Sequence, residues 1–173
     1  QKIFGKVPVG HIANSAAVMD GNPIAMAWTQ KHWVRPGIML YGVSPYPSYA
    51  KKADLKGVMS LKSQVALIKN VPPGTKISYN CTFTTKRPTR IGVVPIGYAD
   101  GYPWSASGKA QVLVKGRRVP VLGRVTMDLL MIDLTDVADA AVGSEVILFG
   151  KQGEETITAE EVAEWSQTIV YEI

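Results

Sequence analysis

Two positions in this sequence carry residue types that can bind an anion. At the first, Asn14 and Ser15 follow an apolar run, where the start of a helix would leave backbone N–H groups free to bind negative charge. At the second, Arg35 stands between apolar runs, and Gly37 allows a ligand to approach the backbone closely. An ordinary helix N-cap by Asn14 or Ser15 is the simpler explanation of the first position, and an ion pair with a turn glycine is the alternative for the second. The residue types alone leave these explanations open.

Three further segments could present side chains to a ligand. Tyr79 follows a Pro-Pro-Gly turn, and a tyrosine can act as a base where cations stabilise its phenolate. Strand packing with a bonded hydroxyl is the alternative for this residue. Residues 97–102 have glycines around an Asp and two tyrosines, as in a shaped binding loop or a tight turn capped by Asp100. Residues 123–128 place a charged pair around Met127, which either packs or faces a ligand, and a surface ion pair explains this pattern as well.

The composition argues against several other kinds of site. Two histidines and one cysteine give no zinc-ligand cluster, and no Ser-His-Asp set, P-loop or dinucleotide fingerprint is present. The net charge of +5 is scattered, so we expect a solvated surface and no nucleic-acid partner. No apolar run reaches the roughly 18 residues of a membrane-spanning helix, so we expect no membrane partner.

The single cysteine and the two ends of the sequence bear on its context. Cys81 has no partner for an intrachain disulfide, which favours a reducing compartment and hence a cytoplasmic location. The sequence begins with Gln1, shows no signal peptide and ends inside an apolar segment. We therefore expect that both ends are cut from a longer protein.

Two zones are predicted to position these segments. The first, residues 1–55, is predicted to hold a buried strand over 7–13, a short helix over 26–33 and a strand within 34–42, an order typical of a parallel α/β arrangement. The second, residues 56–173, is predicted to be a mainly β domain, a barrel or compact sandwich, with one helix that begins at the capping box of Thr158 and Glu161. Its strands are predicted over 59–69, 91–96 with a bulge or edge at Pro95, 111–114 and 118–121 as a hairpin, 129–134 and 145–149.

Six segments, taken together and in order, resemble the alanine racemases over nearly the whole sequence. They are His11–Ala17, Arg35–Gly42, Ile77–Tyr79, Ile96–Tyr102, Gly123–Asp128 and Tyr171–Ile173. The resemblance implies an enzyme that interconverts L- and D-alanine with pyridoxal phosphate and supplies D-alanine for peptidoglycan. It also implies that residues 1–55 are the end of a cofactor-binding α/β (TIM) barrel and that residues 56–173 are the C-terminal β domain.

The resemblance implies roles for eight residues. Tyr79 matches the catalytic tyrosine that takes the α-proton of L-alanine, and Arg35 matches an arginine that faces the pyridine nitrogen and keeps it unprotonated. In the family the tyrosine reaches across a homodimer interface, where a methionine matched by Met127 contacts the substrate carboxylate. A tyrosine matched by Tyr98 narrows the active-site entrance. The residues that match contacts to the cofactor phosphate are Ser15, Gly37, Ile38 and Tyr171.

Several departures from the family pattern accompany the resemblance. The lysine that binds the cofactor lies upstream in the family and is not in this sequence, so we expect the fragment alone to be inactive. Asn80 replaces a glycine, and asparagine tolerates a left-handed backbone. Trp104 replaces a commonly basic residue, and a longer stretch before Arg35 predicts a loop insertion. A serine or broad-specificity racemase, a barrel-type decarboxylase and a non-catalytic β module for dimerisation or binding remain as alternatives.

Overall fold

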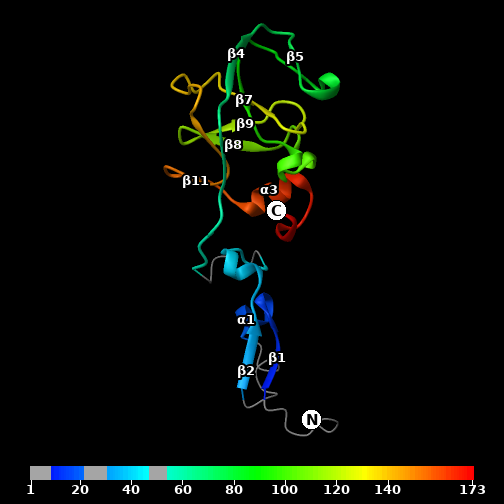
Figure 1. Cartoon of the computed structure of the whole chain (residues 1–173), viewed down its shortest axis with the longest axis vertical. Helices are drawn as coiled ribbons and strands as arrows, with labels where there is room; N and C mark the ends of the chain where they lie inside the picture. The colour runs from blue at the N-terminus through cyan, green and yellow to red at the C-terminus, as the bar shows by residue number, and fades with distance from the viewer. Residues whose placement is uncertain (1–8, 22–30, 47–53) are drawn as a thin grey trace. The chain divides into compact units, whose positions relative to one another are not determined.

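The structure, a computed structural model, describes residues 9–21, 31–46 and 54–173, with the backbone alone for Lys31 and His32. The chain divides into two compact units, residues 1–58 and residues 59–173 (Figure 1). The first unit contains strands and a short helix, whereas the second is built mainly from strands. The mainly β class predicted from the sequence is therefore confirmed.

In the first unit, two parallel strands end side by side. Strand β1 (Val9–Asn14) pairs with β2 (Lys31–Arg35), and Asn14 lies opposite Arg35. Helix α1 (Ser15–Asp20) begins directly after β1, because the Asn14 side chain caps it by accepting a hydrogen bond from the Ala17 N–H at 3.0 Å. A short 3₁₀ helix, η1 (Ile38–Tyr41), follows β2. Adjacent parallel strands followed by helical turns place both turns at the same end of the pair.

Some sequence predictions for this unit were wrong. Of the described residues in the strand predicted over 7–13, only Ala13 is buried. Residues 26–30 of the predicted helix lie outside the described residues, and the remaining three belong to β2. The second strand ends at Arg35 because Pro36 has no N–H with which to continue the ladder.

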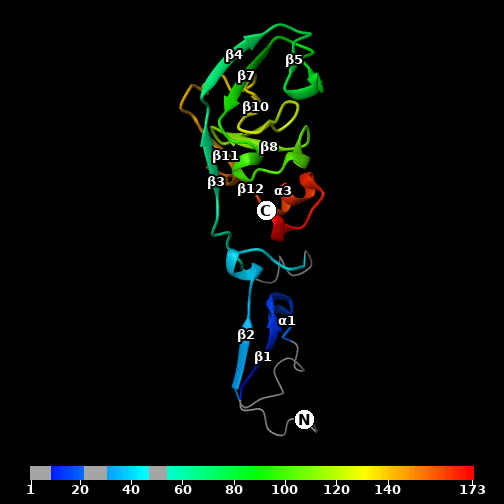
Figure 2. The same ribbon diagram turned by 45° about the vertical axis from the view of Figure 1, so that its right-hand side comes forward.

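The second unit contains two larger antiparallel sheets (Figures 1 and 2). In one, β7 (Thr89–Val94) lies between β4 (Leu67–Val71) and β10 (Leu130–Asp133). The members of the other sheet are β3 (Leu61–Gln64), β8 (Gln111–Val114), β9 (Arg117–Pro120), β11 (Glu145–Gln152) and β12 (Glu155–Ile157). In this sheet β11 pairs with β3, β8 and β12, and β9 pairs with β8. The sheets of the described residues are open rather than closed into one barrel.

The core of this unit lies between the sheets and helix α3 (Ala159–Ser166). Three successive residues of β8 are fully buried, Val112, Leu113 and Val114. Since successive side chains of a strand point to opposite faces, both faces of β8 are covered. The capping box predicted for α3 is present, with the Thr158 hydroxyl and the Glu161 carboxylate each accepting a hydrogen bond from the other residue's backbone N–H.

Two strand boundaries in this unit differ from prediction for reasons of tertiary pairing. The strand predicted over 59–69 is split, because Val65 bonds to Ser144 beside β11 whereas Ala66 bonds to Val93 of β7. The chain therefore passes from one sheet to the other at this point. The strand predicted over 91–96 ends at Val94, so Pro95 lies beyond it rather than within a bulge. The hairpin of β8 and β9 is confirmed, and its turn residues Lys115 and Gly116 both have positive φ.

Candidate functional site

The ends of β1 and β2 bring together three predicted phosphate contacts. The Ser15 hydroxyl oxygen, in a residue only 3% exposed, accepts hydrogen bonds from the N–H groups of Gly37 at 2.8 Å and Met39 at 3.4 Å. Ile38 lies between these two donors at the start of η1, where a backbone N–H has no acceptor within the helix. A hydroxyl and a helix-start N–H at one strand end form a donor set suited to an anion.

Arg35 supplies positive charge beside this cluster. Its side chain is exposed, and it forms no ion pair with any residue that the structure describes. The structural ion pair considered as an alternative is therefore not formed within the described part of the chain. A guanidinium carries only hydrogen-bond donors, so Arg35 favours a neighbouring atom that accepts a hydrogen bond over one that donates it.

Tyr79 lies in the second unit on a tight turn with unusual backbone angles. Strand β5 (Lys76–Ile77) leads into a 3₁₀ turn, η3 (Tyr79–Cys81), and β6 (Phe83–Thr84) returns antiparallel to β5. Three non-glycine residues around the phenol have left-handed φ values: Ser78 at 63°, Asn80 at 57° and Cys81 at 51°. Such conformations cost about 1–3 kcal/mol each and persist where neighbouring contacts impose them. The turn leaves Tyr79 53% exposed, so the packed-strand alternative is wrong.

The segment after β9 holds this turn in place. The Ser78 hydroxyl donates a hydrogen bond of 2.8 Å to the backbone oxygen of Arg124. Gly123, at φ 72°, lies so close that a Cβ on it would be 2.9 Å from Ser78 Cβ and 3.0 Å from Ile77 O. A larger residue at position 123 would therefore push the Tyr79 turn away.

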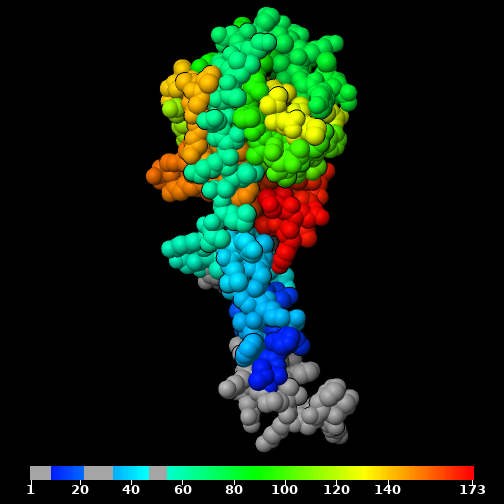
Figure 3. Space-filling model, in the orientation of Figure 1, coloured from blue at the N-terminus to red at the C-terminus, as the bar shows by residue number. Residues whose placement is uncertain are grey.

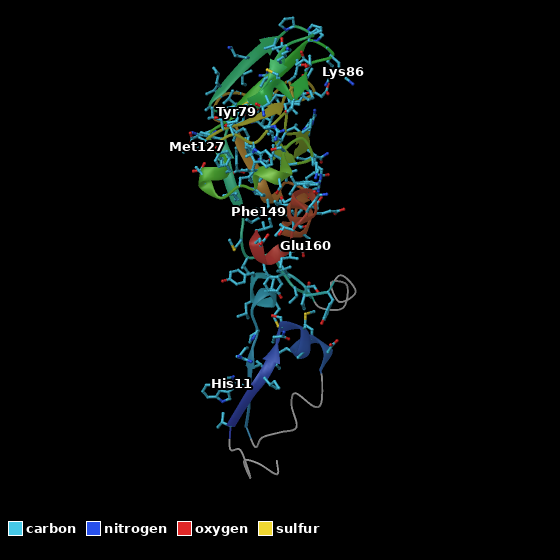
Figure 4. The ribbon with its side chains drawn as sticks, turned by 90° about the vertical axis from the view of Figure 1, so that its right-hand side faces the viewer. His11, Tyr79, Lys86, Met127, Phe149 and Glu160 are labelled. Carbon is cyan, nitrogen blue, oxygen red and sulfur yellow. The ribbon has the colours of Figure 1, made fainter. Side chains whose placement is uncertain are left out.

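Tyr98 and Met127 lie on two loops that are hydrogen-bonded to each other. The N–H of Tyr98 donates to Thr126 O, and the N–H of Ala99 donates to Met127 O, each at 3.0 Å. Asp100 caps the short 3₁₀ helix η4 (Tyr98–Asp100) by accepting from Gly97 N at 2.9 Å. Figure 4 shows Met127 and Tyr79 in the same region of this unit. Three residues that sequence analysis singled out therefore belong to connected segments of one surface.

Arg124 has a partner that sequence analysis missed. It forms no ion pair with Asp128, so the surface ion pair considered for residues 123–128 is absent from the described part of the chain. Its guanidinium carbon instead lies 4.8 Å from the ring centroid of Trp104, within cation–π distance. The only sequence signal was that Trp104 departs from the family pattern, which gave no indication of what its ring contacts.

Tyr102, the second tyrosine of the 97–102 segment, belongs to the core rather than to the site. It is 1% exposed, and its hydroxyl has no hydrogen-bond partner among the described residues. Burial raises the pKa of this phenol well above its ordinary value, because the charged form would lose its water. Only Tyr98 of this pair is available to a ligand, with 45% of its surface exposed.

Tyr171 lies on a short 3₁₀ helix, η6 (Val170–Glu172), that packs against α3. Helix α3 ends where Gln167 adopts a left-handed φ of 56° and the Thr168 N–H bonds to Ala163 O. This reversal turns the chain back, and a hydrogen bond from the Thr168 hydroxyl to Glu172 fixes the last turn. Tyr171 is 64% exposed on the second unit, where the C-terminal residues form part of the surface (red in Figure 3).

Two further searches of the described residues bear on the kind of site. The side chains that the structure places form no group of three or more His, Cys, Asp or Glu residues able to hold a metal ion. The helices it describes include none with the length and apolarity needed to cross a bilayer. Cys81 is free and exposed.

Comparison with known proteins decides the family. The model of the alanine racemase C-terminal domain matches residues 58–173, and that of the alanine racemase N-terminal domain matches residues 2–45. The chain belongs to the alanine racemase family. The resemblance that the six motifs carry in the sequence is therefore confirmed.

Individual alanine racemases match almost the whole chain. The alanine racemase of Halothermothrix orenii is 47% identical over 96% of the chain, and that of Thermodesulfovibrio yellowstonii is 47% identical over 98%. Among solved structures, the alanine racemase from Bacillus anthracis with bound L-Ala-P has a TM-score of 0.84 at 44% identity and covers 94% of the chain. That from Clostridium difficile in complex with cycloserine has a TM-score of 0.81 at 42% identity and also covers 94%.

The chain spans well under half the length of these relatives. It covers 43% of each of the two curated alanine racemases, and 40% and 41% of the two solved chains. It comprises the C-terminal portion of an alanine racemase together with part of the N-terminal domain.

Proposed function

We propose that the protein containing this chain interconverts L- and D-alanine with pyridoxal phosphate, and that Tyr79 moves the α-proton on one face of the substrate. The observation that carries the proposal is the placement of Tyr79. Its phenol is 53% exposed on a turn that is fixed through Ser78 and Gly123, so it can meet a substrate without the turn moving. Membership of the alanine racemase family supports the same chemistry.

The donor set at the ends of β1 and β2 suits the phosphate of the cofactor. The Ser15 hydroxyl, which accepts the Gly37 N–H, lies there beside the N–H of Ile38. We propose Tyr171, which is exposed, as a further contact to the phosphate. Pyridoxal phosphate, when bound, withdraws electrons from the α-carbon of an amino acid and so acidifies its α-hydrogen. Arg35, which keeps its positive charge, would hold a ring nitrogen beside it unprotonated and so favour proton exchange over other reactions.

Inversion at one carbon requires two bases on opposite faces. Tyr79 takes the α-proton of L-alanine and returns it in the reverse reaction, while the lysine that the family uses as the other base belongs to residues upstream of this sequence. Met127, which is 50% exposed, contacts the substrate carboxylate, and Tyr98 limits substrate size at the entrance. Alanine is the proposed substrate, and the bound L-Ala-P of the Bacillus anthracis enzyme supports this class of ligand.

The proposed assembly is a homodimer in which Tyr79 and Met127 of one copy serve the site of the other. Exposed apolar and aromatic side chains on the connected loops support this, because such surfaces mark interfaces. They are Tyr79, Tyr98, Met127 and Leu129. We assign residues 1–55 to the end of the cofactor-binding barrel and residues 56–173 to the β domain. We place the enzyme in the cytoplasm, where the free thiol of Cys81 stays reduced, supplying D-alanine to peptidoglycan.

The test is exchange of the α-hydrogen with solvent deuterium in the full-length enzyme with Tyr79→Phe. Steady-state kcat/KM must fall equally in both directions, because the two enantiomers have equal free energies. Exchange of the α-hydrogen with solvent distinguishes the two bases, because each base removes the α-hydrogen from one enantiomer. We expect loss of exchange from L-alanine by about 100- to 10,000-fold, the usual contribution of a general base. Exchange from D-alanine should persist through the second base.

The matched control is Cys81→Ser, which alters the same turn and keeps the phenol. It should exchange both enantiomers at rates close to those of the wild type. If Tyr79→Phe lost exchange equally from both enantiomers, Tyr79 would not be the base on one face. A wild-type enzyme that exchanged serine as fast as alanine would instead identify a broad-specificity racemase.

A further inference from the structure

The side chain and backbone of Arg124 connect two parts of the second unit. Its backbone oxygen accepts the hydrogen bond from Ser78, the residue before Tyr79. Its guanidinium lies over the ring of Trp104, which belongs to the 3₁₀ helix η5 (Trp104–Ala106). Its Nε is buried and has no hydrogen-bond partner among the described residues. Among the described residues, the group that stabilises the Arg124 guanidinium is the face of the Trp104 indole.

A second attachment joins the same two segments. The N–H of Val125 donates a hydrogen bond of 2.9 Å to the Ser107 hydroxyl, which in turn donates to the carbonyl of Trp104. Helix η5 is itself anchored, since Ala106 is fully buried and α3 packs against the helix. Two successive residues after Gly123 are therefore attached to one rigid turn, by a side chain in Arg124 and by the backbone in Val125.

We propose that Arg124 and Trp104 are positioning residues that set the place of the Tyr79 phenol. The inference rests on the proposed racemase function. The positive φ values of Ser78, Asn80 and Cys81 need an external support, and that support is the segment to which Ser78 is bonded. Stacking of a planar guanidinium on an indole fixes the orientation of the arginine as well as its distance. A shift of this stack moves the Arg124 carbonyl and, through Ser78, the phenol.

This device is particular to a chain with an aromatic residue at position 104. A basic residue at this position would offer no aromatic face and would repel the Arg124 guanidinium. Because Trp104 is 49% exposed, its ring contributes little to the packing of the core. Its contact with the Arg124 guanidinium is the larger part of its role. Replacement of Trp104 should therefore act on the site more than on the fold.

The experiment measures α-hydrogen exchange of each enantiomer separately in full-length enzymes with Trp104→Ala, Trp104→Phe and Arg124→Gln. Loss of a cation–π contact predicts that Trp104→Ala slows exchange from L-alanine by roughly tenfold while exchange from D-alanine stays within about twofold. Trp104→Phe keeps an aromatic face and should recover most of the L-alanine rate. The double variant Trp104→Ala with Arg124→Gln should be no slower than Arg124→Gln alone, because both changes remove the same contact.

The ratio of L- to D-alanine exchange does not depend on the folded fraction, so partial unfolding cannot mimic the expected result. Val142→Ala, at another exposed apolar residue of this unit, is the matched control and should leave the ratio unchanged. An unchanged ratio in Trp104→Ala, or additive losses in the double variant, would overturn the inference. A wild-type enzyme that exchanged neither enantiomer of alanine would overturn the proposed function instead.

Discussion

Gly97 faces the backbone of Met127 so closely that a Cβ on Gly97 would lie 2.3 Å from the Met127 carbonyl oxygen. The same Cβ would lie 2.2 Å from the Thr126 oxygen. This approach allows the two hydrogen bonds from Tyr98 and Ala99 that join the loops. The absence of a side chain at position 97 thus determines where both Tyr98 and Met127 stand.

Replacement of Gly97 by alanine should therefore separate the loops. Overpacking against two backbone oxygens is expected to lower the free energy of unfolding by about 3 kcal/mol, at the upper end of the usual range. Thermal and urea denaturation of the chain measure this change. Gly57→Ala, where a Cβ would meet no atom within 4 Å, is the control and should change stability by less than about 1 kcal/mol. Equal stability of the two variants would show that the backbone around Gly97 has room for a Cβ beside the Thr126 and Met127 oxygens.

Replacement of Ser15 by alanine should weaken binding of the cofactor through its phosphate. The hydroxyl that joins the ends of β1 and β2 is lost, and the Gly37 N–H loses its acceptor. A hydrogen bond to a charged group contributes about 1.5–3 kcal/mol, so the dissociation constant of pyridoxal phosphate should rise at least about tenfold in the full-length enzyme. Absorbance titration measures it. Pyridoxal, which lacks the phosphate, is the control ligand, and an equal loss of affinity for it would contradict a phosphate contact.

Replacement of Tyr98 by alanine should relax substrate selection. Tyr98 is 45% exposed on its loop beside Met127, so truncation would open space at the proposed entrance. One additional substrate atom is typically worth about 10- to 200-fold in discrimination. We expect kcat/KM for serine relative to alanine to rise by about tenfold. Tyr98→Phe keeps the ring and should leave the ratio near its original value. A fall in both activities with a constant ratio would place Tyr98 outside the entrance.

The ion pair of Glu161 with Arg118 should make the second unit less stable at acid pH. Burial raises the pKa of Glu161, but hydrogen bonds from the Arg118 guanidinium and the Thr158 N–H outweigh it, so the pKa lies below its ordinary value of 4.5. A carboxyl whose pKa is lower in the folded state contributes stability that is complete above the unfolded pKa. This contribution is lost as the pH falls through the folded pKa. The free energy of unfolding of the chain should therefore drop below pH 4.5.

Glu161→Gln isolates this effect. The variant should be less stable than the wild type at pH 7, and the two should converge at acid pH, where the carboxyl of the wild type is protonated. Urea denaturation over a pH series measures the difference. Glu164→Gln, on the same helix and without an ion pair among the described residues, is the control and should follow the wild type throughout. A stability difference independent of pH would assign the role of Glu161 to capping geometry alone.

Local sequence patterns predicted elements whose causes are also local. The capping box at Thr158 and the hairpin turn at Lys115 depend on contacts between near neighbours in sequence, and both are present. The split near Val65 was missed, because it depends on hydrogen bonds to residues far along the chain. Periodicity cannot indicate which of two sheets a strand will join.

The candidate site shows the same division. Residue types and motif order identified Tyr79 and Tyr98 as candidates, but they gave no sign that Tyr102 would be buried while Tyr98 is exposed. The two tyrosines have similar local surroundings in the sequence. Only the packing of the sheets decides which ring meets the core.

The sequence by itself determined the family, the mainly β class of the second zone and the residue types available for chemistry, because motif order and strand periodicity are written in neighbouring residues. Only the tertiary structure decided that Ser78 is held by Arg124, that Arg124 rests on Trp104 and that Gly97 admits Met127. These contacts join segments separated by 20 residues or more in the sequence, and in the last two cases they depend on a close approach of atoms. Such approaches follow from how the sheets pack and leave no periodic signal in the sequence.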